Sequence, residues 1–172
     1  MKKIAFMICY LLLIAIPAQA AITHNDLLIM ARVVGFISHH SSGELNVGIV
    51  YAPGVSRSVE EAEDLQAMLG SGLRVGDVFL KPVMVSIEGV NNANVGVFFL
   101  TGGVGNSAQK LLAPCREKQI PCITADISQV RNGSCVIGIV SNPKIEILVN
   151  RSAAANCNTK FSTPFSMMIT EI

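Results

Sequence analysis

Short apolar runs alternate with amphipathic segments along most of the chain. Runs of about four to eight apolar residues between helical segments are typical of βαβ units, because a strand covered by helices on both faces is apolar throughout. The pattern therefore predicts a mostly parallel sheet in an α/β domain. The expected strands are residues 45–51, 80–87, 95–100 and 120–125.

Three segments have the apolar spacing of helices. Residues 27–37 follow Asn25 and Asp26, either of which is a suitable cap, and they are apolar on nearly every side, so this helix needs cover from the core or from a second subunit. A second, amphipathic helix is expected from Ser56 or Ser58 to about residue 69, and a third over residues 106–118.

The last part of the chain predicts a different arrangement. Two apolar runs, residues 135–140 and 145–149, flank the turn sequence Ser141-Asn142-Pro143, which favours an antiparallel hairpin. A short helical piece over residues 153–157 and a terminal helix capped at Thr163-Pro164 are expected after it.

The first twenty residues have the pattern of a secretory signal. Lys2 and Lys3 precede an uncharged apolar run over residues 4–17, and Ala18-Gln19-Ala20 supplies the small residues that signal peptidase requires. We expect cleavage before Ala21, export to the periplasm, and a single mature domain over residues 21–172. The alternative is a membrane anchor, but about 14 apolar residues span only about 21 Å of a hydrocarbon core of about 30 Å.

The charge balance excludes two classes of partner. The formal net charge of the 172 residues is +1, and loss of Lys2 and Lys3 makes it slightly negative. No basic field is left for nucleic acid and no polybasic run for anionic lipid.

Four cysteines remain after the expected cleavage. An even number in an oxidising compartment predicts disulfides, and four cysteines allow three pairings. We favour Cys122 with Cys135, because both lie in or beside predicted strands and 12 residues separate them; Cys115 and Cys157 are the other pair. Buried free thiols or a metal site are the alternatives, although no CxxC spacing typical of zinc sites occurs.

The segment from Thr101 to Ser107 is a candidate ligand site. It lies between a predicted strand and a predicted helix, where glycines let the backbone approach a ligand and a helix N-terminus offers N–H groups to a small anion. The alternative is a tight turn with nothing bound, because glycine is common wherever φ must be positive. The candidate residues are Gly102, Gly103, Gly105, Asn106 and Ser107.

Two further positions follow predicted strands. Ser56 and Arg57 come after the first strand, so they are candidates for the same crevice, where an arginine suits a carboxylate or phosphate. Asp126 follows the strand over residues 120–125 and is either a crevice residue or a cap.

No catalytic constellation is recognisable. The three histidines, His24, His39 and His40, all lie near the start of the mature chain, and no GxSxG motif occurs. Adjacent His39 and His40 suit a solvated loop better than a metal site. The sequence therefore predicts no enzyme, no catalytic residue, no metal and no cofactor.

Three segments in the second half of the chain have a recognisable pattern: residues 133–140, residues 144–150 with Ala153-Ala154, and residues 160–170. In these segments the chain resembles the YfiR-like family of small bacterial periplasmic proteins. The resemblance implies a Rossmann-like, three-layer α/β sandwich, stabilised by disulfides and without catalytic activity. It also implies a partner, because the founding member restrains an inner-membrane diguanylate cyclase through that enzyme's periplasmic region and so acts on cyclic-di-GMP signalling.

Three functional hypotheses follow. The first is a non-enzymatic regulatory protein that binds an inner-membrane sensor or cyclase, with a homodimer as its expected assembly and the helices over residues 27–37 and 60–64 as contact surfaces. The second is a one-lobe periplasmic solute-binding protein of a transport system. Since a full solute-binding protein has two α/β lobes and about 150 residues provide one, a transport-related ancestry is the expected basis of that likeness. The third is an enzyme with a site that the sequence does not reveal.

Overall fold

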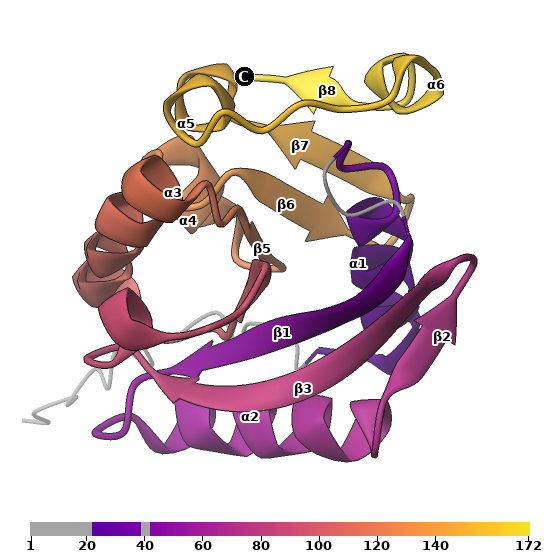
Figure 1. The fold of residues 1–172 in the computed structure, drawn as a ribbon. Helices are drawn as coiled ribbons and strands as arrows, with labels where there is room; N and C mark the ends of the chain where they lie inside the picture. Colours follow the sequence, from indigo (N-terminus) through magenta and orange to yellow (C-terminus); the bar gives the residue numbers. More distant parts are fainter. Residues whose placement is uncertain (1–21, 39–41) are drawn as a thin grey trace, which may run out of the picture.

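The computed structural model describes residues 22–38 and 42–172, which form an eight-stranded mixed sheet with helices on both faces (Figure 1). The predicted signal segment and the His39-His40 pair lie outside these residues. The strand order is β2-β3-β1-β4-β5-β6-β7-β8. The strands are β1 (Gly43–Tyr51), β2 (Leu73–Val75), β3 (Val78–Ser86), β4 (Val97–Leu100), β5 (Cys122–Thr124), β6 (Ile137–Val140), β7 (Glu146–Val149) and β8 (Thr170–Glu171).

Most neighbouring strands are parallel. β1 pairs in parallel with both β3 and β4, and β4–β5, β5–β6 and β7–β8 are also parallel. The hairpin of β6 and β7 is antiparallel, as is the pair of β2 and β3. The predicted fold class, a mostly parallel α/β sandwich with a C-terminal antiparallel hairpin, is confirmed.

The centre of the sheet contains a topological switch point. After β1 the chain continues to β3 on one side of β1, and then to β4 on the other side of β1. Connections therefore leave the carboxyl ends of β1 and β4 in opposite directions. In open α/β sheets such a point opens a crevice in which ligands bind.

Helices of very different lengths connect the strands. α2 lies along β1 and β3, and α1 lies on the same side of the sheet (Figure 1). The two 3-10 segments are η1 (Val90–Asn92) and η2 (Gly105–Leu111). The α-helices are α1 (His24–Val34), α2 (Ser56–Leu69), α3 (Leu112–Lys118), α4 (Ile127–Arg131), α5 (Arg151–Asn156) and α6 (Thr163–Ser166).

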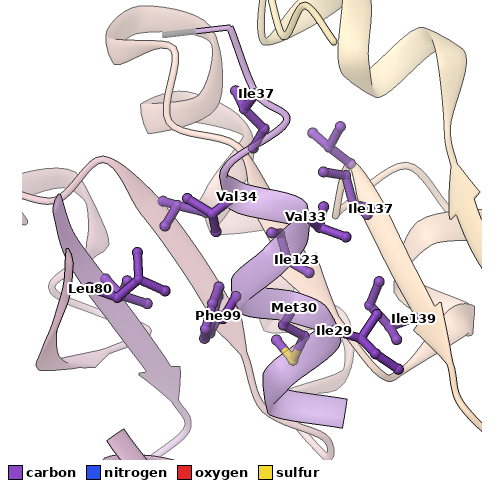
Figure 2. Packing of buried hydrophobic residues seen from close by; sticks show 14 of the residues in the cluster. Ile29, Met30, Val33, Val34, Ile37, Leu80, Phe99, Ile123, Ile137 and Ile139 are labelled. Carbon is purple, nitrogen blue, oxygen red and sulfur yellow. The ribbon is translucent and has the colours of Figure 1, made fainter. Parts of the chain in front are cut away.

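The core has two layers, one on each face of the sheet. On one face, Met30 and Val33 of α1 pack against Phe99 of β4, Ile123 of β5 and Ile137 of β6 (Figure 2). The opposite layer lies between the sheet and η1, η2 and α4. Burial on both faces explains why the strands read as unbroken apolar runs rather than as alternating ones.

Helix α1 is covered by the core of this chain and not by a second subunit. Leu27, Met30 and Val34 are fully buried within this chain. The expectation that the helix presents a contact surface is therefore wrong. Its predicted cap is also wrong, because the N-cap is Thr23, whose hydroxyl accepts from the Asp26 amide at 3.2 Å while the Asp26 carboxylate accepts from the Thr23 amide at 2.7 Å.

Several predicted helix boundaries differ from those observed. The exception is α2, which begins at Ser56 and ends at Leu69 as expected, with Val55 as its N-cap. The helix expected over residues 106–118 begins as the 3-10 segment η2 and becomes α-helical only at Leu112. The terminal helix is a single turn with Ser162 as its N-cap, and the chain then pairs as β8.

Two disulfides join distant parts of the chain. Cys122 of β5 is bonded to Cys135, just before β6, which is the pairing that the sequence favoured. Cys115 of α3 is bonded to Cys157 after α5. The Cα–Cα distances are 5.0 Å and 4.8 Å, within the range of native disulfides.

In the described part of the chain, no helix combines the length and apolarity needed to traverse a bilayer.

Candidate functional site

A cavity of about 180 Å³ lies at the carboxyl ends of the parallel strands. Residues from the loops after β4, β5 and β6 line it, together with residues from the first turns of α1 and α2. This is the edge of the sheet at which the switch point between β1 and β4 opens. Its polar lining residues are Asp26, Arg57, Glu61, Asp126, Ser141 and Asn142, and its apolar ones include Ile22, Ala125, Ile139 and Val140.

Buried hydroxyl groups hold the strand ends beside the cavity in place. The Thr101 hydroxyl, at the end of β4, donates to the Val50 carbonyl at the end of β1 at 2.9 Å. The Thr124 hydroxyl repeats this contact between the next two strands, donating to the Leu100 carbonyl at 3.0 Å. Each threonine thus ties the end of its own strand to the end of the neighbouring strand.

Ser58 connects this arrangement to α2. Its oxygen accepts from the Ala52 amide at 2.9 Å and lies 2.6 Å from the Thr101 hydroxyl oxygen. Because the Thr101 proton goes to the Val50 carbonyl, the Ser58 hydroxyl is the donor to Thr101. The start of α2 is therefore fixed against the loop that carries Gly102.

Glu61 lies one turn after Arg57 in α2 and reaches the loop after β4. Its Oε1 accepts from the Gly102 amide at 3.0 Å, and the side chain is only 7 % exposed. A Cβ atom at position 102 would lie 3.1 Å from Glu61 Oε2, so glycine leaves room for this close approach. The first N–H of the glycine loop thus has an acceptor from the protein itself.

The pKa of Glu61 lies above its ordinary value. Burial raises the pKa of Glu61 above its ordinary value of 4.5, and the negative charges of Asp126 and Asp64 add to this. The Gly102 hydrogen bond and the positive charge of Arg57 lower the same pKa, but they do not cancel the effect of burial.

Asp26 lines the cavity from the first turn of α1. Burial raises the pKa of Asp26, but hydrogen bonds from Ser141 and from the hydroxyl and amide of Thr23 outweigh burial, so the net pKa lies below its ordinary value of 3.8. The Ser141 contact joins the start of α1 to the end of β6. Asp26 is therefore a fixed, ionised carboxylate at neutral pH.

Asp126 both caps a helix and lines the cavity. Its Oδ1 accepts from the Ser128 amide at 3.0 Å and from the Ser128 hydroxyl at 2.6 Å, which makes it the N-cap of α4. Both roles considered for this residue from sequence, crevice residue and cap, are thus seen together.

The structure brings only part of the predicted ligand set to the cavity. Arg57 and Gly102 line it. The glycines that follow have positive φ, 77° at Gly103 and 59° at Gly105, so the turn itself requires them. The remaining candidates, Ser56, Asn106 and Ser107, are exposed and are not part of the lining.

Sequence reasoning missed Glu61, Asp26 and Ser141. Glu61 was assigned with residues 60–64 to a solvent-facing contact surface, which is wrong for this residue because it is buried. The distance of Glu61 from Arg57 along the sequence indicates a shared site, since residues four apart on a helix lie on the same face and Arg57 is a candidate from sequence. Asp26 was identified only as a cap.

The chemistry of the cavity is that of ionic and hydrogen-bonding groups beside an apolar wall. Within residues 22–38 and 42–172, no three His, Cys, Asp or Glu side chains are grouped in a way that could hold a metal ion. The lining offers carboxylates, one guanidinium and a serine hydroxyl. These groups suit the binding of a small polar molecule.

Solved structures share this fold at low sequence identity. A conserved domain protein from Vibrio cholerae matches with a TM-score of 0.58 and 13% identity over 86% of this chain and 59% of that chain. An ABC domain from Streptococcus pneumoniae in complex with L-Trp matches with a TM-score of 0.60 and 8% identity over 84% and 59%. A substrate-binding protein with adhesive properties from Clostridium difficile, in its ligand-free, open form, matches with a TM-score of 0.54 and 10% identity over 88% and 60%.

The chain shares an α/β fold with these three proteins. The chain spans about three fifths of the length of each of these proteins. No protein-family model matches the sequence, and no curated protein matches it.

Proposed function

We propose that this chain is an exported, non-enzymatic binding protein that takes a small solute into the cavity at the carboxyl ends of β4, β5 and β6. The observation that carries the proposal is the place of the cavity, where Arg57, Glu61 and Asp126 converge beside the switch point of the sheet. A neighbour of the same fold was solved with L-Trp, which supports a small organic solute as the class of ligand.

Export is part of the proposal. Two disulfides in a small domain are typical of proteins that fold in an oxidising compartment. The signal pattern of the first twenty residues agrees with this, and the periplasm is the compartment that it favours.

A blocking substitution tests the proposal. Ala125 lines the cavity and is partly exposed, so Ala125→Leu should fill part of the cavity. The purified, disulfide-bonded chain is screened by thermal shift against small amines, carboxylates and amino acids. A ligand at 100 times its Kd should stabilise the wild-type chain by about 2.7 kcal/mol.

Ala125→Leu should abolish this stabilisation, whereas Ala155→Leu, at an exposed position of α5, should retain it. Ligands that stabilise the wild type and Ala125→Leu equally would place binding elsewhere. A screen in which no compound stabilises the wild-type chain would contradict solute binding.

A regulatory role through a protein partner is the second candidate, and the resemblance to the YfiR-like family supports it. The end of the chain exposes large apolar side chains, with Met167 79 %, Met168 56 % and Ile172 45 % exposed. Exposed apolar residues close together in sequence favour a protein contact. The partner implied by the resemblance is the periplasmic region of an inner-membrane sensor or cyclase.

Photo-crosslinking in intact cells tests this role. A crosslinker at Met167 should capture an inner-membrane protein, and one at the exposed Gln66 of α2 should not. Absence of a membrane protein from the Met167 adducts would count against the regulatory role.

A further inference from the structure

We propose that Glu61 determines the charge of the solute, so that the cavity takes a small organic cation and rejects anions. The Glu61 carboxylate occupies the place beside the Gly102 N–H, after β4, where an anionic ligand would otherwise bind. This inference rests on the proposed solute-binding function. It names the ligand class of the same cavity, and it is the opposite of the anionic ligand expected from the glycine loop.

The hydrogen bond to Gly102 carries the first step of the argument. A backbone N–H at the start of the segment after a parallel strand is where an anionic ligand would be expected. Here that N–H donates to Glu61 Oε1 at 3.0 Å, and the carboxylate is held there at 7 % exposure. An incoming anion would have to displace a buried carboxylate that the protein itself supplies.

The charges of the lining carry the second step. Arg57 is the basic side chain of the lining, and its charge already acts on Glu61. Asp26 and Asp126 add two further carboxyl groups to the lining. Three acidic groups against one guanidinium give the cavity a negative potential, which attracts a cation and repels an anion.

The size and the apolar wall carry the third step. A volume of about 180 Å³ is below the roughly 300 to 1,000 Å³ of pockets for drug-sized ligands. Ile22, Ile139 and Val140 are among its lining residues and give it apolar surface. The ligand that fits has a short alkyl part and one ammonium group.

Three molecules of the same shape test the charge preference. Butylammonium, butyrate and 1-butanol differ in charge and have nearly the same size. Calorimetric titration of the wild-type chain at neutral pH should show binding of butylammonium at least about tenfold tighter than binding of butyrate or 1-butanol, since a charge-assisted hydrogen bond contributes this much. Equal or tighter binding of butyrate would overturn the inference while solute binding stands.

Substitutions at Glu61 connect the preference to this side chain. Glu61→Gln keeps the shape and an acceptor for Gly102 and should reduce the preference for butylammonium over 1-butanol about tenfold. Glu63→Gln, at an exposed position of the same helix, should leave it unchanged. A Glu61→Gln chain that keeps the wild-type preference would overturn the role of Glu61.

An added anion tests the position itself. Glu61→Ala removes the carboxylate from the Gly102 N–H, so acetate should bind to this variant and raise its Tm, with no effect on the wild type or on Glu63→Ala. If acetate leaves the Tm of the folded Glu61→Ala variant unchanged, the proposal that the Gly102 N–H can bind an anion is contradicted. If the wild type binds neither the three probes nor any compound of the solute screen, the proposed function is wrong and this inference falls with it.

Discussion

The buried hydroxyl pair of Ser58 and Thr101 gives the sharpest test of how the cavity is held in place. Ser58→Ala removes the acceptor of the amide of Ala52, a buried residue at the end of β1. A buried donor without its acceptor costs about 1 to 3 kcal/mol, and the lost bond to Thr101 adds to this. We expect Ser58→Ala to lower the free energy of unfolding by about 2.5 kcal/mol.

Thr101→Val should cost less, for a reason visible in the structure. The Val50 carbonyl also accepts from the Thr101 amide at 3.1 Å, so it keeps a donor when the hydroxyl is lost. We expect a loss of about 1 kcal/mol. Because the two hydroxyls contact each other, the double variant should cost less than the two single variants together, by at least about 0.5 kcal/mol.

Urea denaturation at a fixed pH measures these differences. The midpoint should shift while the m value stays constant, and Ser56→Ala at the exposed start of α2 should change stability by less than about 0.5 kcal/mol. Strictly additive costs would contradict a stabilising contact between the two hydroxyls, and a Thr101→Val variant that costs as much as Ser58→Ala would contradict the argument that the Val50 carbonyl keeps a donor.

Two further predictions concern charge and crosslinking. Because burial raises the pKa of Glu61, ionising this side chain destabilises the fold as the pH rises above 4.5, the pKa in the unfolded chain. The free energy of unfolding of Glu61→Gln relative to wild type should therefore increase between about pH 4 and about pH 7. A difference in urea melts that stays constant over this range would contradict the raised pKa. Replacing Cys122 and Cys135 by serine should lower the free energy of unfolding by about 3 kcal/mol, and replacing Cys115 and Cys157 by about 4 kcal/mol. The sequence separations are 13 and 42, and loss of the disulfide that closes the longer loop frees more conformational entropy in the unfolded chain. The reverse order of the denaturation midpoints would argue against this explanation.

The central sheet could be predicted from sequence because its strands are buried on both faces and are therefore apolar throughout. Two short elements could not. β2 has three residues with the exposed Arg74 in the middle, and α4 has five residues. Neither is long enough to show a period of 2.0 or 3.6 residues, so tertiary contacts rather than local pattern determine them.

The site could be located but not characterised from sequence. Arg57 and Gly102 were identified because they follow strands whose ends meet at one edge of the sheet. The sequence predicts that Glu61 faces solvent, because a glutamate in an acidic, amphipathic helix is exposed in most proteins. Its burial depends on Gly102 and the hydroxyls of Ser58 and Thr101, which only the fold brings together.

The most direct test of the account is an NMR titration of the ¹⁵N-labelled chain with butylammonium. The account predicts saturable shifts of the amides of Gly102, Asp126 and Ser141, which surround the cavity, and no shifts at Val83, an exposed residue of β3. Saturable shifts that leave these three amides unchanged, or no saturable shift with any compound of the solute screen, would contradict a ligand site at this edge of the sheet.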